Sequence, residues 1–378
     1  MPRRQQPRST GRPPPFGIPA TAAHTIEPPT IQPPTIEAVR SMLAEHGIEH
    51  VGVTTADVLH DARAAIESRI VSGLHDGMAF TFRNPERSTT PERAVEGARS
   101  IIVAARSYLP ADDPPRPEDS SVPARVGRYS WVDHYAPLRA ALREVCMHIR
   151  HAGHRAVAFA DDNSLVDRAV AHRAGLGWYG KNANILLPGA GSFFVLGSIV
   201  TTALYEPAPT PLADGCGTCT RCLDGCPTGA IIEPGVVDGA RCLSWVGQKP
   251  GSIAPELRTA LHDRIYGCDD CQDVCPVSVR LGHRNTIDLT ESAEAWVDAL
   301  DLLESDDEDL LDRHGRWYIA DRDPRWLRRN ALVIVGNIGD RRDRRITEVL
   351  DRYRVGDDPI LAEHASWAFG RLEERHAT

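Results

Sequence analysis

The sequence lacks the features of a membrane protein or a secreted protein. No apolar stretch approaches the roughly 18 residues that a membrane-spanning helix needs, and no secretory signal peptide is recognisable. We therefore expect a cytoplasmic protein without a membrane partner, in which thiols stay reduced and cysteines serve metals. Because the formal net charge is −9, a nucleic-acid partner would have to bind a local basic patch rather than the whole surface.

Phosphate-binding motifs are missing as well. There is no P-loop. Gly175, Gly177 and Gly180 have the spacing of the dinucleotide fingerprint, but the pattern predicts a helix before them and a strand, 184–187, after them. Since that fingerprint needs the opposite order, a Rossmann site is excluded. The pattern Asp-x-His-x-x-Gly is also absent, so a bound corrinoid would receive no histidine ligand from that motif.

Cysteine spacing is the strongest signal in the chain. Eight of the nine cysteines lie between residues 216 and 275, in a run C-x₂-C-x₂-C-x₃-C-P, a single cysteine, and a run C-x₂-C-x₃-C-P. In bacterial ferredoxins three close cysteines bind one [4Fe–4S] cluster and the fourth binds the other cluster. This crossing rule predicts two ligand sets, which are Cys216, Cys219, Cys222 and Cys275 for the first cluster, and Cys226, Cys242, Cys268 and Cys271 for the second.

Zinc and disulfide bonds explain this spacing less well. Zinc sites usually take two pairs of ligands rather than three cysteines at two-residue gaps. Disulfide frameworks are typical of short secreted chains, whereas this chain has 378 residues. The ninth cysteine, Cys146, lies on the apolar face of a predicted helix, so we expect it to be a small buried hydrophobic residue.

The region before the cysteines predicts one α/β domain. Residues 1–35 hold ten prolines and one acidic residue, which indicates a disordered tail. From residue 36 to 205, apolar patterns of helix and strand alternate. Ser164 and Asp167 have the spacing of a capping box, which predicts a helix start at Ser164 after the strand at 155–160.

An internal repeat indicates paired helices at the C-terminus. The apolar positions of residues 327–338 recur 34 residues later in 361–372, and residues 344–353 can form a helix between them. A period of this length predicts a short HEAT-like array. Residues 325–354 contain nine arginines against four acidic residues, which indicates either a solubilising helix face or a phosphate-binding patch.

The domain sizes point to an electron-transfer enzyme. Two cubane clusters move single electrons, and a plain ferredoxin needs only a module of roughly 60 residues. Here 170 residues, 36–205, come directly before the clusters. We expect that domain to hold the group that receives the electrons. Without phosphate-binding motifs, a corrinoid or a flavin fits better than a nucleotide.

Several segments around these motifs resemble epoxyqueuosine reductases. The matching segments are Asp161 with Leu165–Ala169, the run Arg173-Ala-Gly-Leu-Gly-Trp-Tyr-Gly-Lys-Asn182, Cys226-Pro-Thr-Gly-Ala230, Arg241–Ser244 and Arg264–Asp269. The resemblance extends from about residue 36 to the end of the chain. The cluster motif is shared with many ferredoxin-like proteins, but its combination with the Gly-Leu-Gly-Trp-Tyr-Gly-Lys-Asn run is far more restrictive.

The resemblance implies a fold and an activity. The fold would be a mixed α/β or α+β chain with a nitroreductase-like cobalamin-binding domain (36–205), a ferredoxin-like module with two [4Fe–4S] clusters (206–285), and a linker with HEAT-like helical repeats (286–378). The activity would be reduction of epoxyqueuosine to queuosine in a tRNA anticodon loop. Electrons would pass from an external low-potential donor through the clusters to base-off cobalamin. We expect a monomer.

The resemblance also implies roles for individual residues. Asp161 would donate the proton to the departing oxygen. The expected cobalamin contacts are Asp161, Arg128, Lys181, Asn182 and Ser244. From the local excess of arginine, rather than from the resemblance, we expect RNA contacts at Arg341, Arg342, Arg344 and Arg345. Gln248 and Lys249, between Cys242 and Cys268, are either further RNA contacts or ordinary surface residues.

Two questions stay open from the sequence. The family usually follows its aspartate with Thr or Ser and then Gly, whereas Asp162-Asn163-Ser164 follow Asp161 here. Asp161 and Asp162 could serve as helix caps or as acids, and the departure could mark a changed substrate. The alternative functions are a corrinoid reductase of a small molecule, similar to dehalogenases, and an electron-transfer protein. The C-terminal arginines favour RNA, and the long α/β domain disfavours a simple electron carrier.

Overall fold

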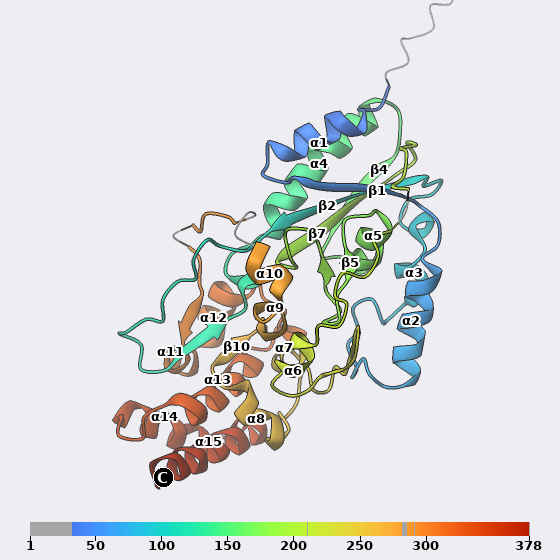
Figure 1. Ribbon diagram of the computed structural model, residues 1–378. Helices are drawn as coiled ribbons and strands as arrows, with labels where there is room; N and C mark the ends of the chain where they lie inside the picture. Colours follow the sequence, from blue (N-terminus) through green and yellow to red (C-terminus); the bar gives the residue numbers. More distant parts are fainter. Residues whose placement is uncertain (1–31, 210, 282–285, 291, 378) are drawn as a thin grey trace, which may run out of the picture.

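The structure is a computed structural model, and it describes residues 32–209, 211–281, 286–290 and 292–377 (Figure 1). The predicted disordered tail lies outside the described residues, except for residues 32–35. Within the described ranges, no helix is both long enough and apolar enough to span a membrane.

A four-stranded sheet forms the core of the N-terminal part. Its strand order is β1 (His50–Thr55), β2 (Ser100–Ser107), β7 (Phe194–Thr201) and β4 (Ala156–Ala160). Apolar side chains of β2 are buried on both faces of the sheet, which explains its continuous run of apolar residues. Helices α1 (Ile36–Ala44) and α4 (Tyr135–His151) pack on one face, together with the buried Cys146, and α5 (Asp167–Arg173) packs on the other. The remaining elements of this part are α2 (His60–Val71), α3 (Pro85–Ser88), η1 (Pro91–Arg93), β3 (Pro123–Val126), η2 (Arg128–Ser130), β5 (Trp178–Tyr179) and β6 (Ile185–Leu186).

All three strand pairings in the sheet are antiparallel, and no strand direction was predicted from the sequence. One detail of this region differs from the sequence prediction. The predicted capping box is wrong, because α5 begins at Asp167 and has no side-chain cap. The Ser164 backbone N–H instead donates to Asp162 Oδ1 at 2.7 Å. This Asx turn competes with helix formation at Ser164.

The cysteine-rich segment folds into short elements between the sheet and the C-terminal helices (Figure 1). These elements are α6 (Arg221–Asp224), β8 (Ile231–Glu233), β9 (Val236–Val237), α7 (Leu243–Gln248), α8 (Pro255–Leu261), β10 (Arg264–Tyr266), α9 (Asp270–Asp273) and α10 (Pro276–Leu281). Such short elements cannot bury a large apolar core, so this segment depends on packing against its neighbours.

The C-terminal part is helical where the repeat predicted helices. It contains β11 (Trp296–Asp298), α11 (Ala299–Glu304), α12 (Asp307–His314), η4 (Ala320–Arg322), α13 (Arg325–Ile338), α14 (Arg344–Arg354) and α15 (Pro359–Ala377). The two predicted repeat faces lie on α13 and α15, which pack together. The contact is close at Gly336, where a Cβ atom would lie 2.8 Å from Ala368 Cα.

A three-stranded sheet joins all three regions of the chain. Its order is β10-β3-β11, with β3 parallel to β10 and antiparallel to β11. Strand β3 comes from the N-terminal part, β10 from the cysteine-rich part and β11 from the C-terminal part. The largest apolar cluster extends from this sheet into α13 and α15. The C-terminal helices therefore pack against the sheet that holds the cysteine-rich segment in place.

Arg329 on α13 makes the firmest polar connection of this support. Its side chain is fully buried, and its guanidinium donates to the backbone carbonyls of Lys249 (2.7 Å), Gly251 (2.6 Å) and Val246 (3.1 Å). These carbonyls belong to α7 and to the loop that follows it. Arg329 thereby satisfies acceptors that a buried helix end would otherwise leave without a donor.

We expect Arg329→Met to lower the free energy of unfolding by about 3 kcal/mol or more, since each buried polar group left unsatisfied costs roughly 1–3 kcal/mol. Arg344→Met is the matched control, because the Arg344 side chain is 89% exposed. It should change stability by less than about 0.5 kcal/mol. Urea unfolding followed by circular dichroism measures both variants. Equal stabilities would show that Arg329 is not an anchor.

Candidate active site and cluster module

Asp161 lies directly after β4, on the loop that leads to α5. Its backbone φ is +56°, a left-handed conformation that is uncommon for residues other than glycine and that Asp and Asn tolerate best. Partial burial raises the pKa of its carboxyl group, Arg139 lowers that pKa, and the charges of Asp133 and Asp162 raise it again. The net shift of this pKa is upward, which is the direction that a proton-donating carboxylic acid needs.

A second acid, Asp167, lies near Asp161 at the start of α5. Its Oδ1 atom is buried and has no hydrogen-bond partner among the described residues. Burial, and then the charge of Asp161, raises the pKa of Asp167 well above its usual range, while Arg168 lowers it. Burial also raises the pKa of Tyr135, and the charges of both acids raise it further. Asp161, Asp167 and Tyr135 therefore form one group of protonatable side chains.

Sequence reasoning missed most of this group. Asp167 was expected only as part of a cap, and Tyr135 and Asp133 were not singled out. Their grouping depends on how the start of α4 and the loop after β4 come together in the fold, which no local pattern reveals. The available signal was the position of Asp167 inside the Leu165–Ala169 run.

Asp162 has a local structural contact. Its Oδ1 atom accepts the Ser164 backbone N–H, and its charge contributes to the raised pKa of Asp161. The sequence left its role open between cap and acid. The hydrogen bond makes Asp162 a turn-forming residue that also acts on its neighbour electrostatically.

The cysteine thiols form two groups. The pKa of Cys222 is raised by burial and then by Cys275, Cys216 and Cys219. The pKa of Cys271 is raised by burial and then by Cys268 and Cys242, with Cys226 also contributing. These effects require the thiols within each set to be close in space, and the two sets are those of the crossing rule. This grouping supports the predicted ligand assignment, which stays a proposal.

The two thiol groups suit clusters better than single ions. Among the described residues, no three His, Cys, Asp or Glu side chains converge on one metal-ion position. Cysteine ligands of a cubane bind four different iron atoms, so they surround the cluster without converging on a point. The pKa of the Cys226 thiol is lowered, which favours the thiolate that binds metal. Burial raises its pKa, but this effect is outweighed by hydrogen bonds from Thr228 and from the Ala230 N–H, whose nitrogen lies 3.2 Å from Sγ.

The residues expected to contact cobalamin make other contacts here. Lys181 Nζ donates to the carbonyl oxygens of Gly217 (2.7 Å) and Cys219 (2.9 Å). Asn182 Nδ2 donates to the carbonyl oxygen of Cys271 at 3.3 Å. Burial raises the pKa of the Cys242 thiol, and hydrogen bonds from the backbone N–H groups of Trp245 and Ser244 partly offset this effect. These three residues therefore contact the cysteine loops.

Arg128 is also held by protein groups. Its guanidinium forms ion pairs with Asp113, with Asp269 (3.3 Å) and with Asp273 (2.6 Å). Three carboxylates hold this side chain, and the predicted cobalamin contact stays a prediction. Arg128 instead ties the loop before α4 to the segment that carries Cys268 and Cys271.

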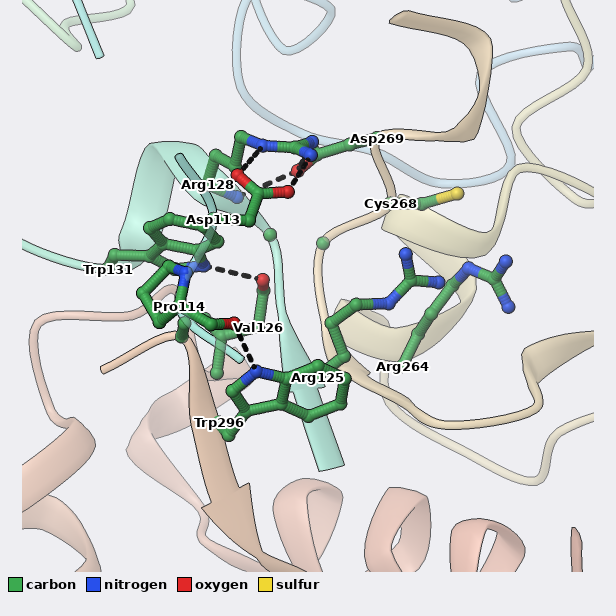
Figure 2. Close-up of a pocket in the computed structure, with 13 residues that line it drawn as sticks. Asp113, Pro114, Arg125, Val126, Arg128, Trp131, Arg264, Cys268, Asp269 and Trp296 are labelled. Carbon is green, nitrogen blue, oxygen red and sulfur yellow. Dashed lines mark hydrogen bonds and ion pairs between the residues drawn. The ribbon is translucent and has the colours of Figure 1, made fainter. Parts of the chain in front are cut away.

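A cavity of about 50 Å³ lies behind Cys268. Figure 2 shows Arg128 and Asp113 at one end of it and Trp296 at the other, where the indole N–H donates to the Pro114 carbonyl at 3.2 Å. Arg125 and Arg264 extend along its side. A space of this size holds water but not a corrin ring, so this cavity is not the cofactor site.

The residues expected to contact RNA are also engaged. Gln248 Nε2 donates to the Tyr129 hydroxyl at 3.2 Å, and Lys249 Nζ pairs with Asp76 at 2.6 Å. The four C-terminal arginines have acidic partners as well, which are Glu373 for Arg341, Asp340 for Arg342, Glu348 for Arg344, and Asp301 with Glu304 for Arg345. Exposed ion pairs of this kind are weak, at about 0–1 kcal/mol, so phosphates could displace the carboxylates.

Three glycines of the segment 175–180 are explained by a hairpin. Strands β5 and β6 pair antiparallel across residues 178–186. A Cβ atom at Gly177 would lie 2.4 Å from the Leu186 carbonyl oxygen, and one at Gly180 would lie 2.7 Å from Asn182 Oδ1. Gly175 has φ +72°. The glycine spacing thus serves close packing, in agreement with the exclusion of a dinucleotide site.

Comparison with known proteins agrees with this geometry. Residues 215–278 match the family model of a 4Fe-4S double cluster binding domain, and residues 89–162 match the model described as Epoxyqueuosine reductase QueG, DUF1730. The epoxyqueuosine reductase of Escherichia coli (strain K12) is 33% identical over 342 residues, which cover 88% of this chain and 88% of that protein. This chain belongs to the epoxyqueuosine reductase family.

Solved structures of epoxyqueuosine reductases have the same fold. One, in complex with a tRNA-Tyr stem loop modified with epoxyqueuosine, matches with a TM-score of 0.80 at 29% identity and covers 89% of this chain and 90% of that chain. Another, from Bacillus subtilis, has its catalytic aspartate loop swung out of the active site and matches with a TM-score of 0.79 at 28% identity, with the same coverage. As a member of the epoxyqueuosine reductase family, this chain is an oxidoreductase with a mixed α/β fold and a double-cluster domain.

Proposed function

We propose that this enzyme reduces epoxyqueuosine to queuosine in the anticodon loop of tRNA. The observation that carries the proposal is the match to epoxyqueuosine reductases over nearly nine-tenths of the chain, in both sequence and fold. The double-cluster domain and the group of protonatable side chains at Asp161 support it, because the reaction needs both electrons and protons. We further propose that the enzyme acts as a monomer and receives electrons from an external low-potential donor.

The chemistry of the reaction sets what the site has to supply. Removing an epoxide oxygen breaks two C–O bonds and forms one C=C bond, and the oxygen leaves as water. This takes two electrons and two protons. Each [4Fe–4S] cluster passes one electron at a time, so two successive transfers complete the reduction. In this proposal, Asp161 gives a proton to the departing oxygen.

We propose base-off cobalamin as the electron acceptor beside Asp161. The buried Asp167 Oδ1, which has no partner among the described residues, fits this cofactor because corrin side chains carry amide N–H donors. Asp167 would accept such a donor. When bound, cobalamin supplies a low-valent cobalt nucleophile for carbon–oxygen cleavage. The chain's own part would be to hold the cofactor, to exclude water and to raise the pKa of Asp161.

Complementation tests the proposed substrate. In bacterial cells that lack their own epoxyqueuosine reductase, expression of this chain should replace epoxyqueuosine by queuosine in tRNA nucleoside digests analysed by mass spectrometry. Unchanged epoxyqueuosine, despite folded protein with both clusters and cobalamin, would favour a corrinoid reductase of a small molecule.

The C-terminal arginines give a separate prediction about tRNA binding. Reversing Arg341, Arg342, Arg344 and Arg345 to glutamate should weaken tRNA binding and flatten its dependence on salt, because fewer counterions are released from the phosphates. Filter binding at several salt concentrations measures this effect. Arg155→Glu is the matched control, since Arg155 is also exposed and paired, with Glu96 at 2.8 Å. Unchanged affinity for tRNA in the fourfold variant would show that these arginines form a solvated helix face and do not bind phosphates.

A further inference from the structure

The hairpin of β5 and β6 extends from the α/β part into the cysteine-rich module. Trp178 and Leu186 of this hairpin form an apolar cluster with Cys275, against which Cys216 and Val277 pack. Both cysteines belong to the first predicted ligand set. At Gly215, a Cβ atom would lie 2.7 Å from the Trp178 ring. The hairpin is therefore in close contact with the site of the first cluster.

Lys181, near the tip of the hairpin, contacts the loop that carries the first three cysteines. Its Nζ atom is 2.7 Å from the Gly217 carbonyl oxygen and 2.9 Å from that of Cys219. The ion pairs among the described residues include Lys249 with Asp76, and none of them involves Lys181. The positive charge at this loop therefore has no directly paired acid.

The use of lysine at this position is itself informative. The chain has 43 basic residues, and Lys181 and Lys249 are its two lysines. Lysine is a compact point charge with three donors, whereas arginine is a planar fork suited to carboxylates and phosphates. Two convergent carbonyl oxygens match the ammonium group. The other lysine, Lys249, has its charge paired with Asp76 at 2.6 Å.

Asn182 makes the corresponding contact on the second loop without a charge. Its Nδ2 atom donates to the Cys271 carbonyl oxygen at 3.3 Å, and its Oδ1 atom accepts the Asn184 N–H at 3.2 Å. Adjacent residues of one hairpin thus hold both cysteine loops. The loop with Cys216 and Cys219 receives a cation, and the loop with Cys271 receives a neutral amide.

We propose that Lys181 sets the reduction potential of the first cluster rather than binding cobalamin. A reduced cluster carries one more negative charge than an oxidised one, and cluster potentials depend on net charge, hydrogen bonding and solvent exposure. A half-buried, unneutralised ammonium beside the loop favours the reduced form, because such charges are screened less than surface charges. Lys181 therefore makes the first cluster easier to reduce than it would otherwise be. This inference rests on the proposed function only in assuming that the cluster passes its electrons on to cobalamin. The effect of Lys181 on the potential does not depend on the substrate.

The test is a redox titration of anaerobically reconstituted enzyme, followed by EPR. Lys181→Met should shift the midpoint potential of one cluster to more negative values and leave that of the other unchanged, with normal iron content. Lys181→Arg keeps the charge and should restore most of the potential. Lys249→Met, which removes the neutralised lysine, and Asn182→Ala should leave the first-cluster potential in place. In a Cys275→Ser background, which lacks the first cluster, Lys181→Met should shift nothing.

Three outcomes would overturn the proposal. Unchanged potentials in Lys181→Met would show that the charge does not act on the cluster. Loss of iron in Lys181→Met would make Lys181 a structural tether. Weaker cobalamin loading with unchanged potentials would instead support the contact between Lys181 and cobalamin that was expected from the sequence. None of these measurements uses tRNA, so failure to convert epoxyqueuosine would count against the proposed function and leave this inference standing.

Discussion

Asp161→Asn should lower the single-turnover rate of epoxyqueuosine reduction by a factor of about 10² to 10⁴, the usual contribution of a general acid. Asparagine keeps the size of the side chain but cannot give up a proton. It also tolerates the left-handed backbone at φ +56°, so the variant should fold normally. Both clusters and cobalamin should still load, because the change removes only the proton donor.

Asp162→Asn is the matched control for this prediction. Asparagine can still accept the Ser164 N–H that Asp162 accepts at 2.7 Å, so the rate should fall by less than about tenfold, in line with the roughly 1 kcal/mol that a capping contact is worth. Near-normal activity in Asp161→Asn together with loss of activity in Asp162→Asn would show that Asp162, and not Asp161, is the general acid.

The pH dependence follows from the raised pKa of Asp161. A general acid acts in its protonated form, so the rate should be highest below the pKa of Asp161 and should fall as pH rises through it. Asp162→Asn removes a negative charge that raises this pKa, so the falling limb should move to lower pH. Rates measured across pH in the unmutated enzyme and in Asp162→Asn test this shift. An identical pH profile in Asp162→Asn would show that the fall in rate at higher pH does not come from deprotonation of Asp161.

Cys275→Ser should remove the first cluster, although Cys275 lies in the second sequence motif. Its thiol groups with Cys216, Cys219 and Cys222. From two cubane sites we expect about eight irons per chain in the unmutated protein and about half of that in the variant. The remaining EPR signal should match that of Cys216→Ser and differ from that of Cys271→Ser. A match to Cys271→Ser would contradict the crossing assignment.

The sequence predicted the features that depend on local spacing. The cysteine runs predicted two thiol groups, because ferredoxin-type ligands follow fixed intervals along the chain. The strand at residues 155–160, which is β4 (Ala156–Ala160), and the helices of the C-terminal repeat were predicted from their apolar patterns. Cys146 is buried as predicted, since it lies on the apolar face of α4.

The features that depend on distant partners could not be predicted in the same way. Strand β3 has four residues and β11 has three, which is too few to show a periodic pattern. The sheet that joins the three regions could therefore not be recognised in the sequence. Arg345 is paired with Asp301 and Glu304, residues more than 40 positions away, so an excess of arginine in the sequence did not become a free basic surface.

The candidate site shows the same division. Asp161 was predicted through its resemblance to a family motif, and its left-handed backbone and raised pKa agree with the proposed role. Lys181 and Asn182 were recognised as important from the same motif, but their contacts with the cysteine loops depend on how the hairpin packs. A motif thus identified the residues, and only the fold shows what they contact.

The most direct test of the central proposal is a single-turnover reaction. Anaerobically purified enzyme carrying both clusters and cobalamin is reduced chemically and mixed with tRNA that contains epoxyqueuosine, and the tRNA nucleosides are then separated and identified by mass spectrometry. The proposal predicts queuosine in amounts that approach one equivalent per two electrons supplied, and none when cobalamin is omitted. Recovery of intact epoxyqueuosine from fully loaded, reduced enzyme would contradict it.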